Sequence, residues 1–122
     1  MSSAEHDRRI DYIEFSVKSM ADAKRFYGSA FGWSFEDYGP DYASFADGRL
    51  TGGFQTTAAV KPGGPLVVIY AADLEALEQR VRKAGGTIVR PIFSFPGGRR
   101  FHFTDPSSNE LAVWSDKEKR ER

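Results

Sequence analysis

Polar and apolar residues alternate over residues 10–17, and this pattern predicts a β-strand with Tyr12 and Glu14 on the same face. From residue 20 to 31, apolar residues recur every three or four positions, which predicts a helix with one buried face. Gly32 fits the left-handed position that commonly ends a helix. The pattern therefore begins with a strand followed by a helix.

The same order of elements is predicted twice along the chain. After the first helix, extended runs are predicted at residues 33–37, 42–46 and 50–56. The second half predicts a strand at 66–71, a helix that begins at Asp73 and stops at Gly85, and strands at 87–89, 99–104 and 110–115. A loop is expected at 92–98. A repeated strand, helix and three strands indicates a duplicated unit.

The length of the chain, 122 residues, is that of one domain with its own core. The stretch between the two halves is rich in proline and glycine, and we interpret it as a linker within that domain. The expected organisation is a flexible leader at 1–8, a single domain at 9–116 made of module one (9–57), a linker (58–64) and module two (65–116), and a tail at 117–122.

Charge and composition exclude several classes of function. Seventeen Lys and Arg balance seventeen Asp and Glu, so no net charge attracts nucleic acid or a membrane surface. The chain has no cysteine, which excludes disulfides, thiolate metal ligands and a cysteine nucleophile. No apolar run approaches the roughly 20 residues that span a bilayer. No secretory signal is visible at residues 1–9, so we expect a cytoplasmic protein.

Short motifs at the helix ends and before the last strand carry a family resemblance. They are Phe26-Tyr27, Phe31-Gly32-Trp33, Ala84-Gly85-Gly86, and Phe103-Thr104-Asp105-Pro106 followed by Asn109. Together they resemble the vicinal oxygen chelate superfamily, which includes the glyoxalases, the bleomycin-resistance proteins and the extradiol dioxygenases. The resemblance implies an α+β fold of two βαβββ modules in tandem that form a cupped mixed sheet, a small-molecule ligand and a homodimer.

Metal-using members of that superfamily bind a divalent ion through a His on the first strand, a His or Gln in the second half and a Glu on the last strand. In this sequence those positions fall on Tyr12, Leu66 and Ala112. A phenol, an isobutyl group and a methyl group do not supply the three or four N or O donors that zinc, iron or manganese requires. We therefore expect no metal at the family's usual site, and no other cofactor.

Glu14 and His102 are the candidate catalytic groups. His102 matches a position where the ring-cleaving members carry a pocket tyrosine, and it should face the cup beside Ala112. There it either donates a hydrogen bond or moves a proton, or its ring is satisfied by a backbone carbonyl or a neighbouring acid. Glu14 shares a strand face with Tyr12. It either contributes to the pocket, lies at the solvent rim or pairs with Arg100.

The predicted ligand-binding residues are Tyr12, Glu14, Tyr70, His102, Ala112 and Trp114. The missing metal ligands and the aromatic cup favour a metal-free protein that binds a small, partly aromatic molecule. The alternative is a glyoxalase-like lyase or a dioxygenase-like enzyme that uses Glu14 and His102 as acid–base groups or as shifted metal ligands. A third hypothesis is a regulatory or assembly domain whose cup is filled by side chains.

Overall fold

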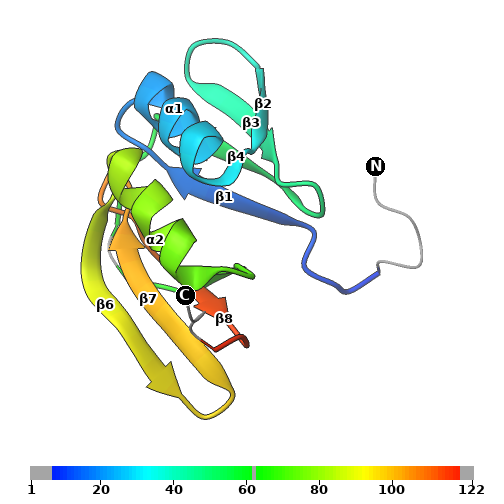
Figure 1. Cartoon of the computed structure of the whole chain (residues 1–122). Helices are drawn as coiled ribbons and strands as arrows, with labels where there is room; N and C mark the ends of the chain where they lie inside the picture. The colour runs from blue at the N-terminus through cyan, green and yellow to red at the C-terminus, as the bar shows by residue number, and fades with distance from the viewer. Residues whose placement is uncertain (1–6, 62, 119–122) are drawn as a thin grey trace.

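The computed structural model describes residues 7–61 and 63–118, and Figure 1 shows their arrangement. In chain order the elements are β1 (Tyr12–Ser16), α1 (Met20–Phe31), β2 (Ser34–Asp37), β3 (Tyr42–Ala46), β4 (Thr51–Gln55), β5 (Val67–Tyr70), α2 (Leu74–Lys83), β6 (Thr87–Phe95), β7 (Gly98–Thr104) and β8 (Glu110–Ser115). Most of the predicted leader and tail, at 1–6 and 119–122, lies outside the described residues. The domain limits stay predictions.

Each half of the chain forms its own four-stranded sheet, and the two sheets have equivalent strand orders. The first sheet has the order β1-β4-β3-β2, with β1 parallel to β4 and the other pairs antiparallel. The second has the order β5-β8-β7-β6, with β5 parallel to β8. The predicted α+β fold of two βαβββ modules is confirmed. Module one here means β1 to β4 with α1, and module two means β5 to β8 with α2.

The two helices begin and end as the sequence predicts. The side chains of Ser19 and Asp73 each accept a hydrogen bond of 3.1 Å from the backbone N–H three residues further on, which caps the helix that follows. Gly32 and Gly85 have φ angles of 74° and 105°, a region that glycine enters without steric cost. Within residues 7–61 and 63–118, neither helix is long and apolar enough to cross a membrane.

The predicted loop at 92–98 is wrong, because β6 runs through most of that range and ends at Phe95. Its pairing with β7 shifts twice, once on each side of Arg90. Such bulges interrupt the alternation of faces, so the sequence pattern there does not indicate a strand. Pro91 is tolerated because β6 is the edge strand of its sheet.

Both helices pack on the same side of the sheets, α1 over module one and α2 over module two (Figure 1). The largest buried aromatic side chains are Phe26, Tyr27, Phe54, Phe101 and Phe103. The ring centroids of Phe26 and Phe103 are 5.9 Å apart, so one core runs through both modules. Residues of the opposite strand parity, such as Tyr12 and Glu14, project from the other face of the sheets.

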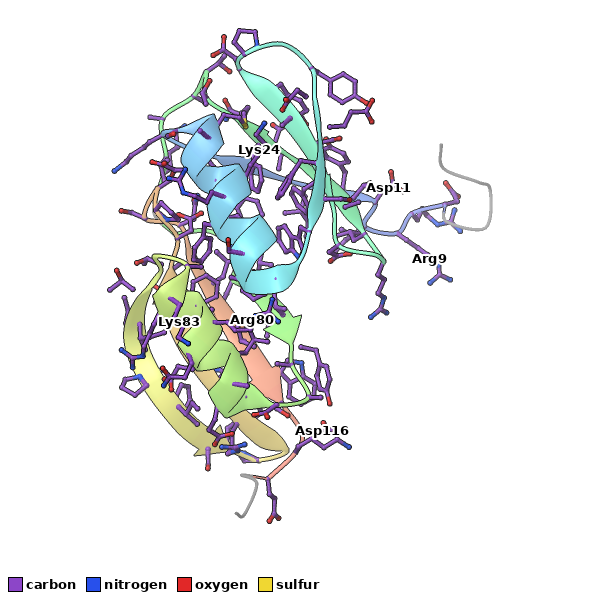
Figure 2. All side chains as sticks on the ribbon, turned by 45° about the horizontal axis from the view of Figure 1, so that its top comes forward. Arg9, Asp11, Lys24, Arg80, Lys83 and Asp116 are labelled. Carbon is purple, nitrogen blue, oxygen red and sulfur yellow. The ribbon has the colours of Figure 1, made fainter. Side chains whose placement is uncertain are left out.

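The turn between β7 and β8 holds the end of β1. Asn109 Nδ2 donates a hydrogen bond of 2.9 Å to the carbonyl of Ser16, and the backbone N–H of Lys18 donates one of 2.7 Å to Ser107 Oγ. Between the helices, Arg80 of α2 donates to a carbonyl of α1 at 3.2 Å (Figure 2). These contacts fix β1 and α1 relative to module two and therefore define the space between the modules.

Candidate ligand-binding site

A cleft of about 1000 Å³ lies between the two modules. It is lined by β1, by the connection between the modules and by parts of β5, β7 and the turn before β8. Tyr12, Glu14 and His102, three of the six residues predicted to bind a ligand, line this cleft. The tertiary structure therefore brings the two candidate chemical groups, Glu14 and His102, to one concave surface from different modules.

Three side chains of module one form a hydrogen-bonded chain beside the cleft. The hydroxyl oxygens of Tyr12 and Tyr42 are 2.5 Å apart, and Tyr42 donates a hydrogen bond of 2.8 Å to Glu14 Oε2. Because Tyr42 lies on β3 and the other two on β1, its side chain crosses the intervening strand β4. Partial burial and the hydrogen bonds to Tyr12 and Glu14 raise the pKa of Tyr42, so it is a neutral phenol at neutral pH.

Gly53 makes room for this chain. It pairs with Glu14 on β1 and with Ser44 on β3. A Cβ atom at Gly53 would lie 2.0 Å from the hydroxyl of Tyr42 and 2.6 Å from that of Tyr12. Gly52 serves the core instead, since its Cβ would lie 2.2 Å from the carbonyl of Ile13. The two glycines of β4 therefore allow close approach on opposite faces of the same sheet.

His102 lies on β7 opposite Ala112 of β8, and its side chain is buried, with 6% of the residue exposed. Its Nδ1 lies 2.9 Å from Glu110 Oε2. Its Nε2 is buried and has no hydrogen-bond partner among the described residues. The imidazole is thus satisfied at Nδ1 by a neighbouring acid, while Nε2 lacks a hydrogen-bond partner among the described residues. A buried polar atom without a partner is uncommon in folded proteins.

Glu14 and His102 each have their own partner, and no hydrogen bond joins them. Glu14 accepts from Tyr42 and not from Arg100, whose Nε is buried without a partner among the described residues. The expected alternative that Glu14 pairs with Arg100 is therefore wrong. The guanidinium of Arg100 instead lies 5.4 Å from the ring centroid of Phe93.

Tyr70, Ala112 and Trp114 do not line the cleft described above. Ala112 is fully buried. The rings of Tyr70 and Trp114 pack edge to face at 5.5 Å, and Tyr70 donates a hydrogen bond of 2.8 Å to Asp116 Oδ1. Tyr70 and Trp114 thus lie together at the end of the last strand, outside the cleft, and Ala112 lies in the interior.

Sequence reasoning missed Tyr42 and Glu110. Glu110 has the strand parity of Ala112, which places it on the face where His102 was expected. Tyr42 has no local signal, because its role depends on a strand pairing and on the absence of a side chain at Gly53. A phenol facing a glycine on the adjacent strand is visible only once the register is known.

The residues at the family's metal positions do not fit a divalent ion. Tyr12 supplies one oxygen, which is already hydrogen-bonded to Tyr42, and the side chains of Leu66 and Ala112 supply none. In the part of the chain that the structure describes, no group of three or more His, Cys, Asp or Glu residues is placed to hold a metal. The donor set therefore does not match that of a metal-using relative.

The chain matches the model of the Glyoxalase/Bleomycin resistance protein/Dioxygenase superfamily over residues 9–113. It therefore belongs to this superfamily, as the sequence motifs indicated. The match spans both modules and the cleft between them.

Among curated proteins, CFP32 of Mycobacterium bovis, which its name assigns only provisionally to the glyoxylases, is 25% identical over 115 residues. These residues cover 85% of this chain and 44% of CFP32, so the chain spans less than half of that relative.

Solved structures show the same fold at low identity. A glyoxalase/bleomycin resistance protein/dioxygenase family enzyme of Burkholderia phytofirmans has a TM-score of 0.78 at 14% identity, covering 88% of this chain and 100% of that one. The fosfomycin resistance protein FosX of Listeria monocytogenes, a mutant in complex with Mn(II) and 1S,2S-dihydroxypropylphosphonic acid, has a TM-score of 0.75 at 14% identity. That match covers 87% of this chain and 88% of FosX. At these identities the likeness shows the fold alone.

Proposed function

We propose that this protein binds a small molecule in the cleft between its modules, and that it does so without the divalent metal of its metal-using relatives. The observation that carries the proposal is a cleft of about 1000 Å³ lined by His102, whose Nε2 is buried without a partner among the described residues. Small-molecule sites are concave, largely apolar and supplied with a few fixed polar groups. Tyr12 and Glu14, held in place by Tyr42, are such groups.

The metal-free part of the proposal rests on the donor set. The Mn(II) in the FosX structure belongs to that protein. In this chain the three positions to which the family resemblance assigns metal ligands hold a phenol, an isobutyl group and a methyl group, which leaves too few donors for a stable site.

The test combines elemental analysis with a ligand screen. We expect purified protein, after dialysis against mixed divalent ions and then buffer, to retain far less than one ion per chain. A library of small aromatic compounds is then screened by protein-observed NMR, and we expect the binders to shift amides of β1 and residues 102–110. A stoichiometric ion contradicts the metal-free proposal. If no compound of the library shifts an amide resonance at the cleft, the proposal of ligand binding is contradicted.

A second candidate function is catalysis, and the pairing of His102 with Glu110 favours it. A carboxylate at Nδ1 orients an imidazole whose Nε2 can exchange a proton with a bound molecule. Such an enzyme would be a glyoxalase-like lyase or a dioxygenase-like enzyme, with Glu14 as the second group across the cleft. The measurement is product analysis by NMR after each binder is incubated with the protein. A binding protein returns the compound unchanged, and an enzyme converts it at a rate that falls in His102→Gln.

We propose further that the protein is a homodimer, acting in the cytoplasm without nucleic acid. Support comes from two alternate residues of β5, Val68 and Tyr70, which expose apolar side chains. Light scattering coupled to gel filtration tests the dimer. We expect Val68→Asp to give the mass of one chain. The matched control is Val89→Asp on the edge strand β6, because both valines are 44% exposed. A wild-type mass of 13.6 kDa, that of one chain, contradicts the proposal.

A further inference from the structure

The hydrogen atoms in the Tyr12–Tyr42–Glu14 chain can be assigned by counting donors. A tyrosine has one O–H, and Tyr42 gives its own to Glu14 Oε2. The hydroxyls of Tyr12 and Tyr42 are 2.5 Å apart, so the hydrogen between them must come from Tyr12. With its only hydrogen used, Tyr12 presents lone pairs to the cleft. Glu14, as a carboxylate, also presents only acceptors.

The same count applies to His102 on the other module. The carboxylate of Glu110 accepts a hydrogen bond, so Nδ1 of the neutral ring carries the hydrogen between them. Nε2 of that tautomer is an acceptor. It is also the atom that is buried without a partner among the described residues. Module two therefore contributes to the cleft wall a histidine with an unsatisfied acceptor, whose burial without a donor is unfavourable.

The charged residues that line the cleft also favour a ligand that donates hydrogen bonds. Glu14 and Glu110 are acidic, and Lys61 on the connection between modules is the only lysine or arginine among the described residues that line it. Lys24 and Lys83 belong to the helices (Figure 2), and the helices cover the face of the sheets opposite to the one from which Glu14 projects. An anion entering the cleft would meet carboxylates and lone pairs, whereas a cation with N–H groups would satisfy them.

We propose that the cleft selects an organic cation with several N–H donors, an amidinium, guanidinium or ammonium group on an apolar or aromatic body. The charged group donates to Glu14 and to the oxygen of Tyr12, and an N–H of the ligand reaches Nε2 of His102. The apolar body lies against side chains such as Ile13 and Leu66, which line the same cleft. This inference rests on the proposed binding function and adds the chemical class of the ligand.

Three compounds of nearly equal shape test the inference: benzamidine, which is a cation, benzamide, which is neutral, and benzoate, which is an anion. Each is titrated into ¹⁵N-labelled wild-type protein, and the amide and imidazole resonances are followed. We expect benzamidine to shift amides of β1 and the Nε2 resonance of His102, with an affinity about tenfold or more above that of benzamide, the ratio typical of a charge-assisted hydrogen bond. We expect no shift at the cleft with benzoate.

Substitutions in the protein supply the second arm of the test. Glu14→Gln keeps an oxygen that accepts from Tyr42 and removes the charge, so we expect benzamidine to bind about tenfold more weakly. Tyr12→Phe, which keeps the ring, should weaken it by a smaller factor. The matched control is Glu36→Gln. Glu36 is exposed on β2 at the far edge of the same sheet and does not line the cleft, so benzamidine should bind this variant as it binds wild type.

The outcomes separate this inference from the proposed function. Benzamide or benzoate binding in the cleft as tightly as benzamidine overturns the preference for a cation and leaves a binding cleft intact. An equal loss of affinity in Glu14→Gln and Glu36→Gln also overturns it, because the effect would then be one of net charge. If none of the three compounds shifts a resonance at the cleft, the inference is overturned as well. The proposed function is then decided separately, by the library screen.

Discussion

Tyr27 on α1 donates a hydrogen bond of 2.8 Å to Asp105 Oδ2, which lies 78 residues further along the chain in the turn before β8. Both residues are buried. The other oxygen of Asp105 accepts from the backbone N–H groups of Ser107 and Asn109. One carboxylate therefore closes its own turn and ties module one to module two. The Phe-Tyr motif and the Asp-Pro motif of the sequence meet at this point.

Replacing Tyr27 by Phe should destabilise the protein by about 1–3 kcal/mol, since a buried carboxylate then loses one of its donors. Urea unfolding followed by tryptophan fluorescence measures the change in free energy of unfolding. The control is Tyr38→Phe on an exposed tyrosine, which should stay within about 0.5 kcal/mol of wild type. A Tyr27→Phe variant as stable as the control would show that the hydrogen bond contributes nothing.

Alkaline pH should weaken the fold partly through the same residue. Burial, and then the neighbouring Asp105 carboxylate, raise the pKa of Tyr27 above the ordinary tyrosine value of about 10. Above about pH 10 the unfolded chain releases this proton and the native state keeps it, so the free energy of unfolding falls as pH rises. Below about pH 10 the contribution is present in full. Unfolding measured between pH 8 and 11 should therefore decline less steeply in Tyr27→Phe, and equal slopes would contradict this.

Replacing the two glycines of β4 by alanine, one at a time, should separate effects on ligand binding from effects on stability. In Gly53→Ala the new Cβ meets the hydroxyl ends of Tyr42 and Tyr12, which can move, so the fold persists and binding in the cleft is lost. In Gly52→Ala it meets the backbone of Ile13 and the ring of Phe45, so we expect a loss of roughly 1–3 kcal/mol in stability. Thermal unfolding and ligand titration of both variants measure the two effects. Reversed results would refute the assignment of the two faces.

The tautomer of His102 should depend on Glu110. We expect ¹⁵N spectra of the neutral imidazole to place the hydrogen on Nδ1, since that atom faces the carboxylate. Glu110→Gln should shift the population toward the Nε2–H form, and Glu78→Gln on α2 should leave it unchanged. A hydrogen found on Nε2 in the wild-type protein would remove the acceptor that the cleft offers to a ligand.

Chelation of divalent metals should leave the stability unchanged. A bound metal stabilises the state that holds it, and its removal lowers the melting temperature. Thermal unfolding with and without excess EDTA should therefore give the same midpoint for this protein. A midpoint several degrees lower in EDTA would reveal a structural ion and contradict the metal-free proposal.

The sequence by itself determined the elements and their order. Helix caps at Ser19 and Asp73, stop positions at Gly32 and Gly85, and alternation along the strands are rules that act within a few residues, so they can be seen in the sequence. The duplicated unit could be predicted because the same local signals occur in the same order in both halves of the chain. Those rules failed at β6, where two bulges break the alternation and an edge position tolerates Pro91.

Tertiary structure alone decided how the site is built. Tyr42 reaches Glu14 because strand pairing brings together residues 28 apart in the chain and because Gly53 leaves the path open. His102 and Glu110, only eight residues apart, meet because their hairpin register puts both on one face. Hydrogen bonds extend about 3 Å and depend on direction, so the donor and acceptor pattern of a cleft is set by pairing and packing, which local sequence patterns do not specify.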